Sequence, residues 1–261
     1  GAVSAAAAAC AFVRAFGRPV VVKADGLAAG KGVIVCDTPD EAIAAVDHIM
    51  GDRAFGAAGD QVVIEERLSG LELSALALCD GERAALMPLA RDHKRALDGD
   101  RGVNTGGMGV ICPVEVDENV RMAIAEEVID RTLDGLNAEG VRFRGVLYAG
   151  LMLTPQGVRV LEYNCRFGDP ETEAILPLFD GDLAEVLAAC ARGELDPAAV
   201  RWRAGACATV IAASAGYPGA YPVGLPIAGL DADQPDSAVF HAGTRRDTDG
   251  RIVTAGGRVL A

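Results

Sequence analysis

The sequence predicts a mixed α/β, or α+β, fold that ends in the start of a β-rich domain, with the β-rich segment at 205–261 after a linker. Short apolar runs such as 19–24, bounded by glycine and proline, have the length and punctuation of strands. The segment after Asp117 carries apolar residues at helical spacing as far as Leu136, which indicates a long helix. Thr154-Pro155-Gln156-Gly157 separates two further apolar runs and is typical of a hairpin turn.

Helices and strands are expected to alternate along the first part of the chain. The alanine-rich opening segment has no basic lead, which argues against a secretory signal and favours a helix. Thr38 and Pro39 are typical of a helix start, whereas five glycines between Gly99 and Gly109 predict a shaped loop without regular structure. We expect helices at 4–16, 39–50, 117–136 and 182–192, and strands at 19–24, 32–36, 61–66, 72–79, 84–89, 145–153 and 158–164.

Composition excludes several classes of protein. The 261 residues can bury a sizeable core, and no uncharged apolar run reaches the roughly 18 residues of a membrane span. A net charge of -13 disfavours a nucleic-acid surface. Seven cysteines without a Cys-x-x-Cys pair are typical of reduced thiols. We therefore expect a cytoplasmic protein that binds neither nucleic acid nor membrane, and we expect a monomer.

Lysine is rare in this chain, because only Lys23, Lys31 and Lys94 occur among the 24 basic residues. Two of these lysines lie in the glycine-rich segment 23–32, between two expected strands. Glycine lets backbone N–H groups approach an anion closely, so this segment is typical of a lid over a triphosphate. It lacks the spacing and the Ser or Thr of a Walker A loop. An ordinary glycine-rich turn is the alternative.

Acidic residues follow the third expected strand. Glu65 and Glu66 lie at its end, and Glu72 comes seven residues after Glu65. A strand edge offers backbone groups to an adenine, and a carboxylate can accept hydrogen bonds from ribose hydroxyls. Exposed glutamates on an ordinary surface explain the same pattern.

A second segment combines charges of both signs with glycine. Asp92, His93 and Lys94 precede Asn104 and the Gly106-Gly107 pair. Such a segment suits a loop that closes on small anions, and a solvated turn is the alternative. His93 is either a general base or a hydrogen-bonding residue with a structural role.

The segment 161–171 contains the most closely spaced polar residues that could take part in catalysis or metal binding. Glu162 and Asn164 lie on one face of an expected strand, about 6.5 Å apart, because side chains alternate with a period of two. Oxygen ligands at this spacing can hold Mg²⁺ against phosphates. Arg166 extends the same side and can offset charge on a phosphoryl group. A Glu–Arg pair on a strand is the simpler interpretation.

Taken together, these segments resemble the glycinamide ribonucleotide synthetase family of the ATP-grasp superfamily. The resemblance runs over nearly the whole chain, and its most specific part is Asn-Cys-Arg-Phe-Gly-Asp-Pro-Glu-Thr at 164–172. The other matching strings are 23–32, 92–95, 104–109, 147–152, 216–219, 240–244 and 256–260.

The resemblance implies an ATP-grasp fold that binds ATP and Mg²⁺ or Mn²⁺ between two β-structures. Glu162 and Asn164 match the metal ligands of the family. The nucleotide contacts that the resemblance implies are Lys23, Gly30, Lys31 and Gly32 at the phosphates, Glu65, Glu66 and Leu68 at the adenine, and Glu72 at the ribose.

The implied reaction is a step of purine biosynthesis. ATP phosphorylates the carboxylate of glycine, and the amine of 5-phosphoribosylamine attacks the glycyl phosphate to give glycinamide ribonucleotide, ADP and phosphate. Arg166, Lys31 and Asp169 are the catalytic residues that the resemblance implies. Those implied to bind substrate are Asp92, His93, Lys94, Asn104, Gly106, Gly107, Asp169, Glu171 and Arg258.

The resemblance also implies a domain organisation. We expect an ATP-grasp core at 1–193, with a lid subdomain at about 18–66, and a partial C-terminal domain at 194–261. The N-terminal substrate domain of the family is absent from this sequence. Arg91, Glu173 and Leu71 depart from the family pattern beside its motifs.

Two rival functions share these features. Another ATP-grasp carboxylate–amine ligase would have the same nucleotide machinery but should lack the Asp-His-Lys-Arg and Gly-Asp-Pro-Glu strings. A truncated nucleotide-binding fragment would bind ATP without turnover. Binding and turnover measured together separate these possibilities.

Overall fold

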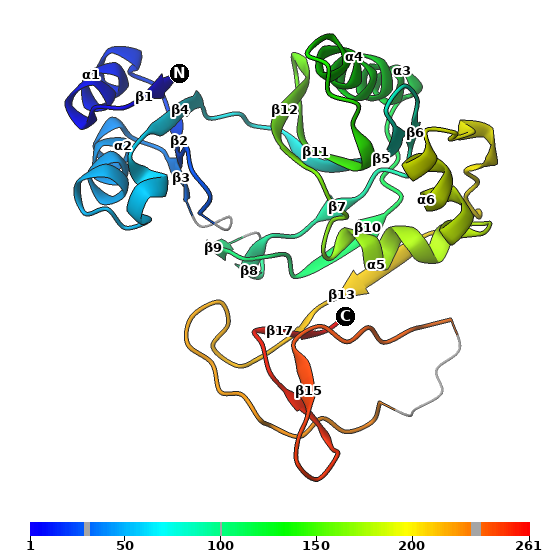
Figure 1. Ribbon diagram of the computed structural model, residues 1–261. Helices are drawn as coiled ribbons and strands as arrows, with labels where there is room; N and C mark the ends of the chain where they lie inside the picture. Colours follow the sequence, from blue (N-terminus) through cyan, green and yellow to red (C-terminus); the bar gives the residue numbers. More distant parts are fainter. Residues whose placement is uncertain (29–31, 100, 231–235) are drawn as a thin grey trace. The chain divides into compact units, whose positions relative to one another are not determined.

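The structure is a computed structural model that describes residues 1–28, 32–99, 101–230 and 236–261. It divides into two compact units, Gly1–Ser69 and Gly70–Ala261 (Figure 1). The predicted domain boundary at 193 does not coincide with the division between these two units. That domain boundary remains a prediction.

The first unit is a four-stranded antiparallel sheet with helices packed against it. Its strand order is β1-β4-β2-β3, and β2 pairs with both β3 and β4. Thr38 starts the second helix with a reciprocal capping box, in which its hydroxyl accepts from Glu41 and the Glu41 carboxylate accepts from Thr38. The elements are β1 Ala2–Val3, α1 Ala6–Phe16, β2 Val20–Ala24, β3 Val33–Cys36, α2 Pro39–Val46, η1 Asp47–Gly51, η2 Gly56–Gly59 and β4 Val62–Glu66.

The second unit is built on the sheet β12-β11-β5-β6, whose strands are all antiparallel. Because side chains alternate along a strand, β5 and β11 present one apolar row to each face. One face packs against α3, η3 and α4, and the other against α5, η4 and α6 (Figure 1). The elements are β5 Leu71–Asp80, β6 Ala84–Leu86, α3 Glu118–Ala123, η3 Ile124–Asp130, α4 Arg131–Ala138, β11 Arg144–Thr154, β12 Gly157–Asn164, α5 Glu171–Ile175, η4 Leu176–Leu178 and α6 Leu183–Arg192.

Shorter strands complete the second unit. The strands β7 and β13 pair with the two edges of β10, and β8 pairs with β9. The last part of the chain forms the pairs β14–β17 and β15–β16. The bounds are β7 Arg91–Asp92, β8 Arg95–Leu97, β9 Arg101–Asn104, β10 Gly109–Cys112, η5 Pro197–Ala199, β13 Cys207–Val210, β14 Ala212–Ala213, β15 Thr244–Arg246, β16 Ile252–Thr254 and β17 Arg258–Leu260.

The predicted mixed α/β class and the β-rich final region are confirmed, and two local predictions are wrong. The segment 99–109 contains β9 and the start of β10, because Arg95 and Asn104 pair across a hairpin despite the glycines. The strand expected at 84–89 ends at Leu86.

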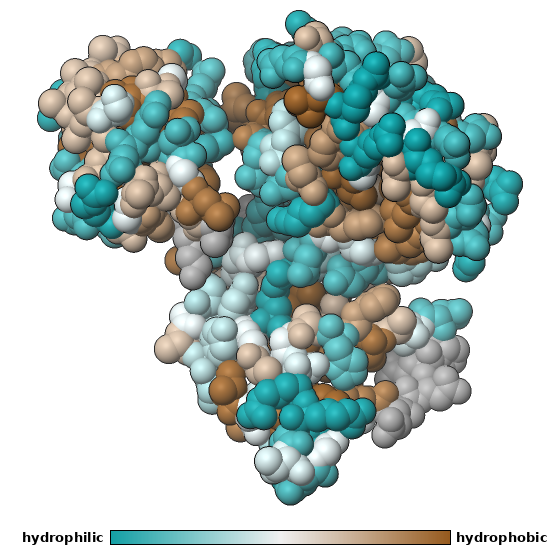
Figure 2. All heavy atoms as spheres, viewed as in Figure 1, coloured by the Kyte–Doolittle hydropathy of each residue, from teal (hydrophilic) through white to brown (hydrophobic). Residues whose placement is uncertain are grey.

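No helix in the described part of the chain is long and apolar enough to cross a membrane. The face of the α4 and α6 region seen in Figure 2 is mostly hydrophilic.

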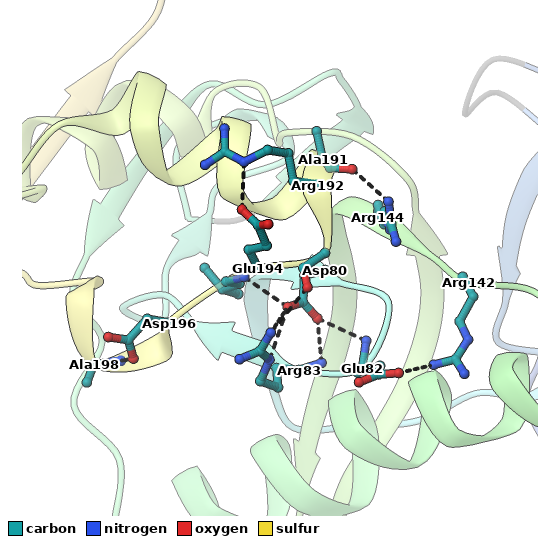
Figure 3. Close-up of polar contacts among 12 residues, drawn as sticks. Asp80, Glu82, Arg83, Arg142, Arg144, Ala191, Arg192, Glu194, Asp196 and Ala198 are labelled. Atoms are coloured by element: carbon teal, nitrogen blue, oxygen red, sulfur yellow. Dashed lines mark hydrogen bonds and ion pairs between the residues drawn. The ribbon is translucent and has the colours of Figure 1, made fainter.

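A buried carboxylate joins the end of β5 to the segment after α6. Asp80 accepts hydrogen bonds from the backbone N–H groups of Glu82, Arg83 and Leu195, at 2.9, 2.7 and 2.9 Å (Figure 3). The Arg83 guanidinium adds an ion pair at 2.9 Å. Burial alone would raise the pKa of Asp80, but these donors outweigh burial and hold it below its ordinary value.

We expect Asp80→Asn to lower the free energy of unfolding by about 2–4 kcal/mol at pH 7, because it removes a buried, hydrogen-bonded charge. A depressed carboxyl pKa stabilises the fold fully above its unfolded value, near 3.9, and this stabilisation is lost as pH falls through the folded pKa. The variant should therefore lose less stability than the parent below pH 4 in urea titrations. Glu82→Gln, in an exposed pair with Arg142, is the control and should cost under about 1 kcal/mol.

Candidate active site

In the first unit, a lysine and a glutamate meet on neighbouring strands. Lys23 lies near the end of β2, and its Nζ is 2.6 Å from Oε2 of Glu65 on β4. The adjacent Glu66 pairs instead with Arg18 at 3.3 Å, and both of those side chains are exposed. The ammonium of Lys23 near the end of β2 is thus paired with a carboxylate of the neighbouring strand β4.

The glycine-rich segment after β2 is partly described. A Cβ on Gly32 would lie 2.7 Å from Ala28 Cβ and 3.0 Å from Ala24 Cβ, so a side chain there would need its neighbours to move. Gly30 and Lys31 lie outside the described residues. Leu68 is half-buried in the connection between β4 and β5.

In the second unit, one face of the central sheet changes from core to polar surface along its strands. Ser74, Gly150 and Glu162 occupy neighbouring positions across β5, β11 and β12, and Tyr148 pairs with Asn164 in the next row. Partners in antiparallel strands share a face. Glu162 and Asn164 therefore share one face, as the sequence predicted, and Tyr148 lies on that face too.

Glu171 is buried at the start of α5, with 3% of its surface exposed. Its Oε1 accepts from the hydroxyls of Ser74, at 2.8 Å, and Tyr148, at 3.0 Å. Burial, followed by the charge of Glu171, raises the pKa of Tyr148, so the phenol stays protonated and donates. Two strands therefore hold this carboxylate in one position.

Asp92, the last residue of β7, and Lys94, two residues later, lie near the Glu171 carboxylate. Burial and the charge of Glu171 raise the pKa of Asp92 to about 7. Burial alone would lower the pKa of Lys94, but Glu72 and Asp92 raise it overall, so the ammonium stays charged. The Lys94 Nζ is 3.5 Å from Glu72 Oε2.

A cavity of about 10 Å³ lies between these side chains, lined by residues including Glu72, Ser74, Asp92, Lys94 and Gly150. This volume admits one water molecule. Asp92 Oδ1 is buried, and among the described residues it has no hydrogen-bond partner. Since a buried acceptor without a partner costs free energy, the polar lining is suited to a small polar ligand.

The glycine-rich loop is fixed at both of its central residues. Gly106 N–H donates to Tyr217 Oη at 3.1 Å, and Gly106 O accepts from Arg258 Nη1 at 2.8 Å. Gly107 has φ +113°, and a Cβ there would lie 2.7 Å from Asp92 Oδ1 and would collide with Pro170. Only glycine fits this position.

The remaining predicted residues have exposed side chains. His93 and Asn104 are exposed, and the His93 backbone pairs with Gly109 and Met108. Arg166 is exposed, and its Nη1 donates to the carbonyl of Phe167 at 2.8 Å. The exposed Asp169 forms an ion pair with Arg258 at 3.0 Å.

The residues predicted to bind metal fit a magnesium ion in the chemistry of their donors. Glu162 supplies a carboxylate and Asn164 an amide oxygen on one face of β12. The described residues contain no group of three or more His, Cys, Asp or Glu that could hold a metal. Two protein ligands suit Mg²⁺, which keeps waters and binds substrate phosphates.

Sequence reasoning missed Ser74, Tyr148 and Tyr217 as members of this site. A serine inside the apolar run of β5 was the available signal, because a buried hydroxyl needs a partner. Tyr148 has the same signal in β11. Nothing local in the sequence indicates that Tyr217 reaches Gly106, which is 111 residues away.

Comparison with known proteins gives consistent results. Residues 2–172 match the family described as phosphoribosylglycinamide synthetase, ATP-grasp (A) domain, and residues 207–261 match its C domain. A phosphoribosylamine–glycine ligase of Nostoc sp. is 52% identical over 261 residues, covering 98% of this chain and 61% of the relative. A trifunctional purine biosynthetic protein of Gallus gallus is 52% identical over 257 residues, covering 97% of this chain and 26% of the relative.

Solved structures show the same fold. The phosphoribosylamine–glycine ligase of Thermotoga maritima has a TM-score of 0.89 at 41% identity, covering all of this chain and 64% of the other. A biotin carboxylase domain of Hydrogenobacter thermophilus has a TM-score of 0.70 at 14% identity, covering 98% of this chain and 57% of the other. The latter likeness supports the fold alone. The chain thus spans about 60% of its single-function relatives and a quarter of the trifunctional one.

We expect the pKa of Asp92 to be visible in stability measurements. A carboxyl whose folded pKa is about 7 binds a proton more tightly than in the unfolded chain, so stability falls as pH rises from about 4 to about 7. Asp92→Asn keeps the shape without the charge and should flatten this part of the curve. Urea midpoints at pH 4 to 8 measure the slope, and an unchanged slope would place the titrating group elsewhere.

Proposed function

We propose, from the premise that this chain belongs to the phosphoribosylglycinamide synthetase family, that it catalyses the ATP-dependent joining of glycine to 5-phosphoribosylamine. The products are glycinamide ribonucleotide, ADP and phosphate. The observation that carries the proposal is the single face of β5, β11 and β12. Two hydroxyls on this face bind the buried Glu171 carboxylate. Adjacent rows of the same face carry Glu162 and Asn164, whose side-chain oxygens are suited to bind a metal ion.

The chemistry begins with a poor acyl donor. The carboxylate of glycine attacks the γ-phosphorus of ATP, ADP leaves, and a glycyl phosphate forms. The amine of 5-phosphoribosylamine then attacks the acyl carbon and loses a proton to solvent. The amide bond forms as the bond between the acyl carbon and the phosphate oxygen breaks, and phosphate leaves. Each step needs positioning and charge compensation rather than a covalent enzyme nucleophile.

Residues of the first unit are proposed to contact the nucleotide. Lys23 supplies an ammonium for the phosphates, and Gly30, Lys31 and Gly32 of the glycine-rich segment are proposed to contact them as well. Glu65, Glu66 and Leu68 provide the adenine contacts. The ion pair of Lys23 with Glu65 supports this assignment, because it orients the ammonium near the end of β2.

Residues of the second unit are proposed to hold metal and substrates. Glu162 and Asn164 would hold Mg²⁺ or Mn²⁺, which supplies charge neutralisation for the phosphates when bound. The exposed guanidinium of Arg166 would compensate charge at the transferring phosphoryl group. Glu72 would contact the ribose. The substrate contacts are proposed at Asp92, His93, Lys94, Asn104, Gly106, Gly107, Asp169 and Glu171.

The reaction is tested by two assays on the purified protein. Coupled detection of ADP and direct detection of glycinamide ribonucleotide should both require glycine, Mg²⁺ and, for the second product, 5-phosphoribosylamine. ADP formation that responds to another carboxylate but not to glycine would indicate a different ATP-grasp ligase. ATP binding without any ADP formation would indicate a nucleotide-binding protein without turnover.

We expect Glu162→Gln and Asn164→Ala to weaken metal-dependent ATP binding by about tenfold or more each, because each removes an oxygen ligand. Isothermal calorimetry at several Mg²⁺ concentrations measures the effect. The matched control is Glu126→Gln on the exposed surface of η3, which should bind as the parent does. Equal losses in all three variants would show that the assigned ligands are wrong.

A further inference from the structure

The final strand of the chain reaches the glycine-rich loop through one arginine. Arg258 lies at the start of β17, and its side chain is only 21% exposed. Its Nη1 donates to Gly106 O at 2.8 Å, to Asp169 O at 3.1 Å and to Asp169 Oδ1 at 3.0 Å. Its Nη2 donates to Asp169 Oδ2 at 3.1 Å. The guanidinium therefore joins two segments that are 63 residues apart.

A tyrosine from the same region completes the hold on Gly106. Tyr217 Oη accepts from Gly106 N–H at 3.1 Å, so both backbone polar groups of this glycine bind residues from the last 45 of the chain. A Cβ at Gly106 would lie 3.0 Å from Arg258 Cζ. The absence of a side chain is what lets the guanidinium lie against the loop backbone.

The opposite side of the loop touches the buried acidic site. Gly107 lies against Pro170 and Asp92, and Pro170 directly precedes Glu171. A shift of Gly106 would consequently move Gly107 relative to Asp92 and Glu171. Arg258 also fixes Asp169, two residues before Glu171, so it acts on the acidic site by two routes.

We propose that Arg258, assisted by Tyr217, is a positioning residue that holds the 104–109 loop and Asp169 against the acidic site. Its guanidinium makes contacts with protein oxygens in a fork that matches the Asp169 carboxylate. This role differs from direct substrate binding, which the sequence predicted for Arg258. It rests on the proposed function, because what is positioned is the substrate site of that reaction.

Hydrogen exchange tests the hold on the loop without requiring turnover. The amides of residues 105–108 all have acceptors, on Lys94, Tyr217, Thr105 and His93. Arg258→Met should speed their exchange by roughly ten- to hundredfold, because charge-assisted bonds to Gly106 and Asp169 are lost. Tyr217→Phe removes the hydroxyl that accepts from Gly106 N–H, so it should speed exchange at Gly106 more than at the other amides. This second variant still tests the proposal if Arg258→Met disturbs the strand β17.

The matched control is Arg251→Met. Arg251 also pairs with acidic side chains, Asp247 at 3.0 Å and Asp249 at 2.6 Å, but within its own hairpin. The control should leave exchange at 105–108 unchanged. Unchanged exchange in both Arg258→Met and Tyr217→Phe would overturn the proposal.

Kinetics on the same variants separate positioning from direct binding. Misplaced groups lower kcat, so glycine-dependent ADP formation by Arg258→Met should fall roughly ten- to hundredfold in kcat, with the KM for ATP unchanged. A raised KM for glycine or 5-phosphoribosylamine with normal exchange at 105–108 would show instead that Arg258 binds substrate. Faster exchange with normal kcat would also overturn the proposal. No ADP formation by the parent protein would contradict the proposed function, while the exchange data would still decide whether Arg258 holds the loop.

Discussion

The antiparallel register of β5, β11 and β12 is the constraint on which the candidate site depends. It fixes Ser74 opposite Gly150, and Gly150 opposite Glu162. Because the side-chain period is two, a slip of one residue would move these groups to the face covered by α3, η3 and α4. The apolar rows that pack against the helices on both faces therefore also determine where the polar groups point.

Burying acidic groups in this sheet has a cost that the neighbouring residues offset. Glu171 receives two hydroxyl hydrogen bonds, and Lys94 lies near Glu72. Asp92 is less well compensated, since burial and the charge of Glu171 raise its pKa to about 7. A carboxyl with a raised pKa beside a small polar cavity, as Asp92 is here, is typical of functional sites. The carboxylate of Asp92, whose ionisation is disfavoured, therefore lies where we propose that substrate binds.

Local patterns in the sequence predicted much of the fold, because strand length, helical periodicity and turn residues are local properties. The hairpin around Thr154-Pro155 and the shared face of Glu162 and Asn164 are examples. The β8–β9 hairpin was missed because cross-strand pairing outweighed the low strand propensity of glycine. The contact of Tyr217 with Gly106 could not be predicted, since it depends on how distant segments pack. The phosphate contacts of Gly30 and Lys31 remain predictions, because these residues lie outside the described part of the chain.

The central claim is that ATP activates the carboxylate of glycine through an acyl phosphate. Transfer of ¹⁸O tests it most directly, because a carboxylate oxygen that has attacked phosphorus leaves with the phosphate. With glycine labelled in its carboxylate, 5-phosphoribosylamine and MgATP, we predict that the released phosphate carries one ¹⁸O atom from glycine, as read by mass spectrometry. Phosphate that carries no oxygen from glycine would contradict the account.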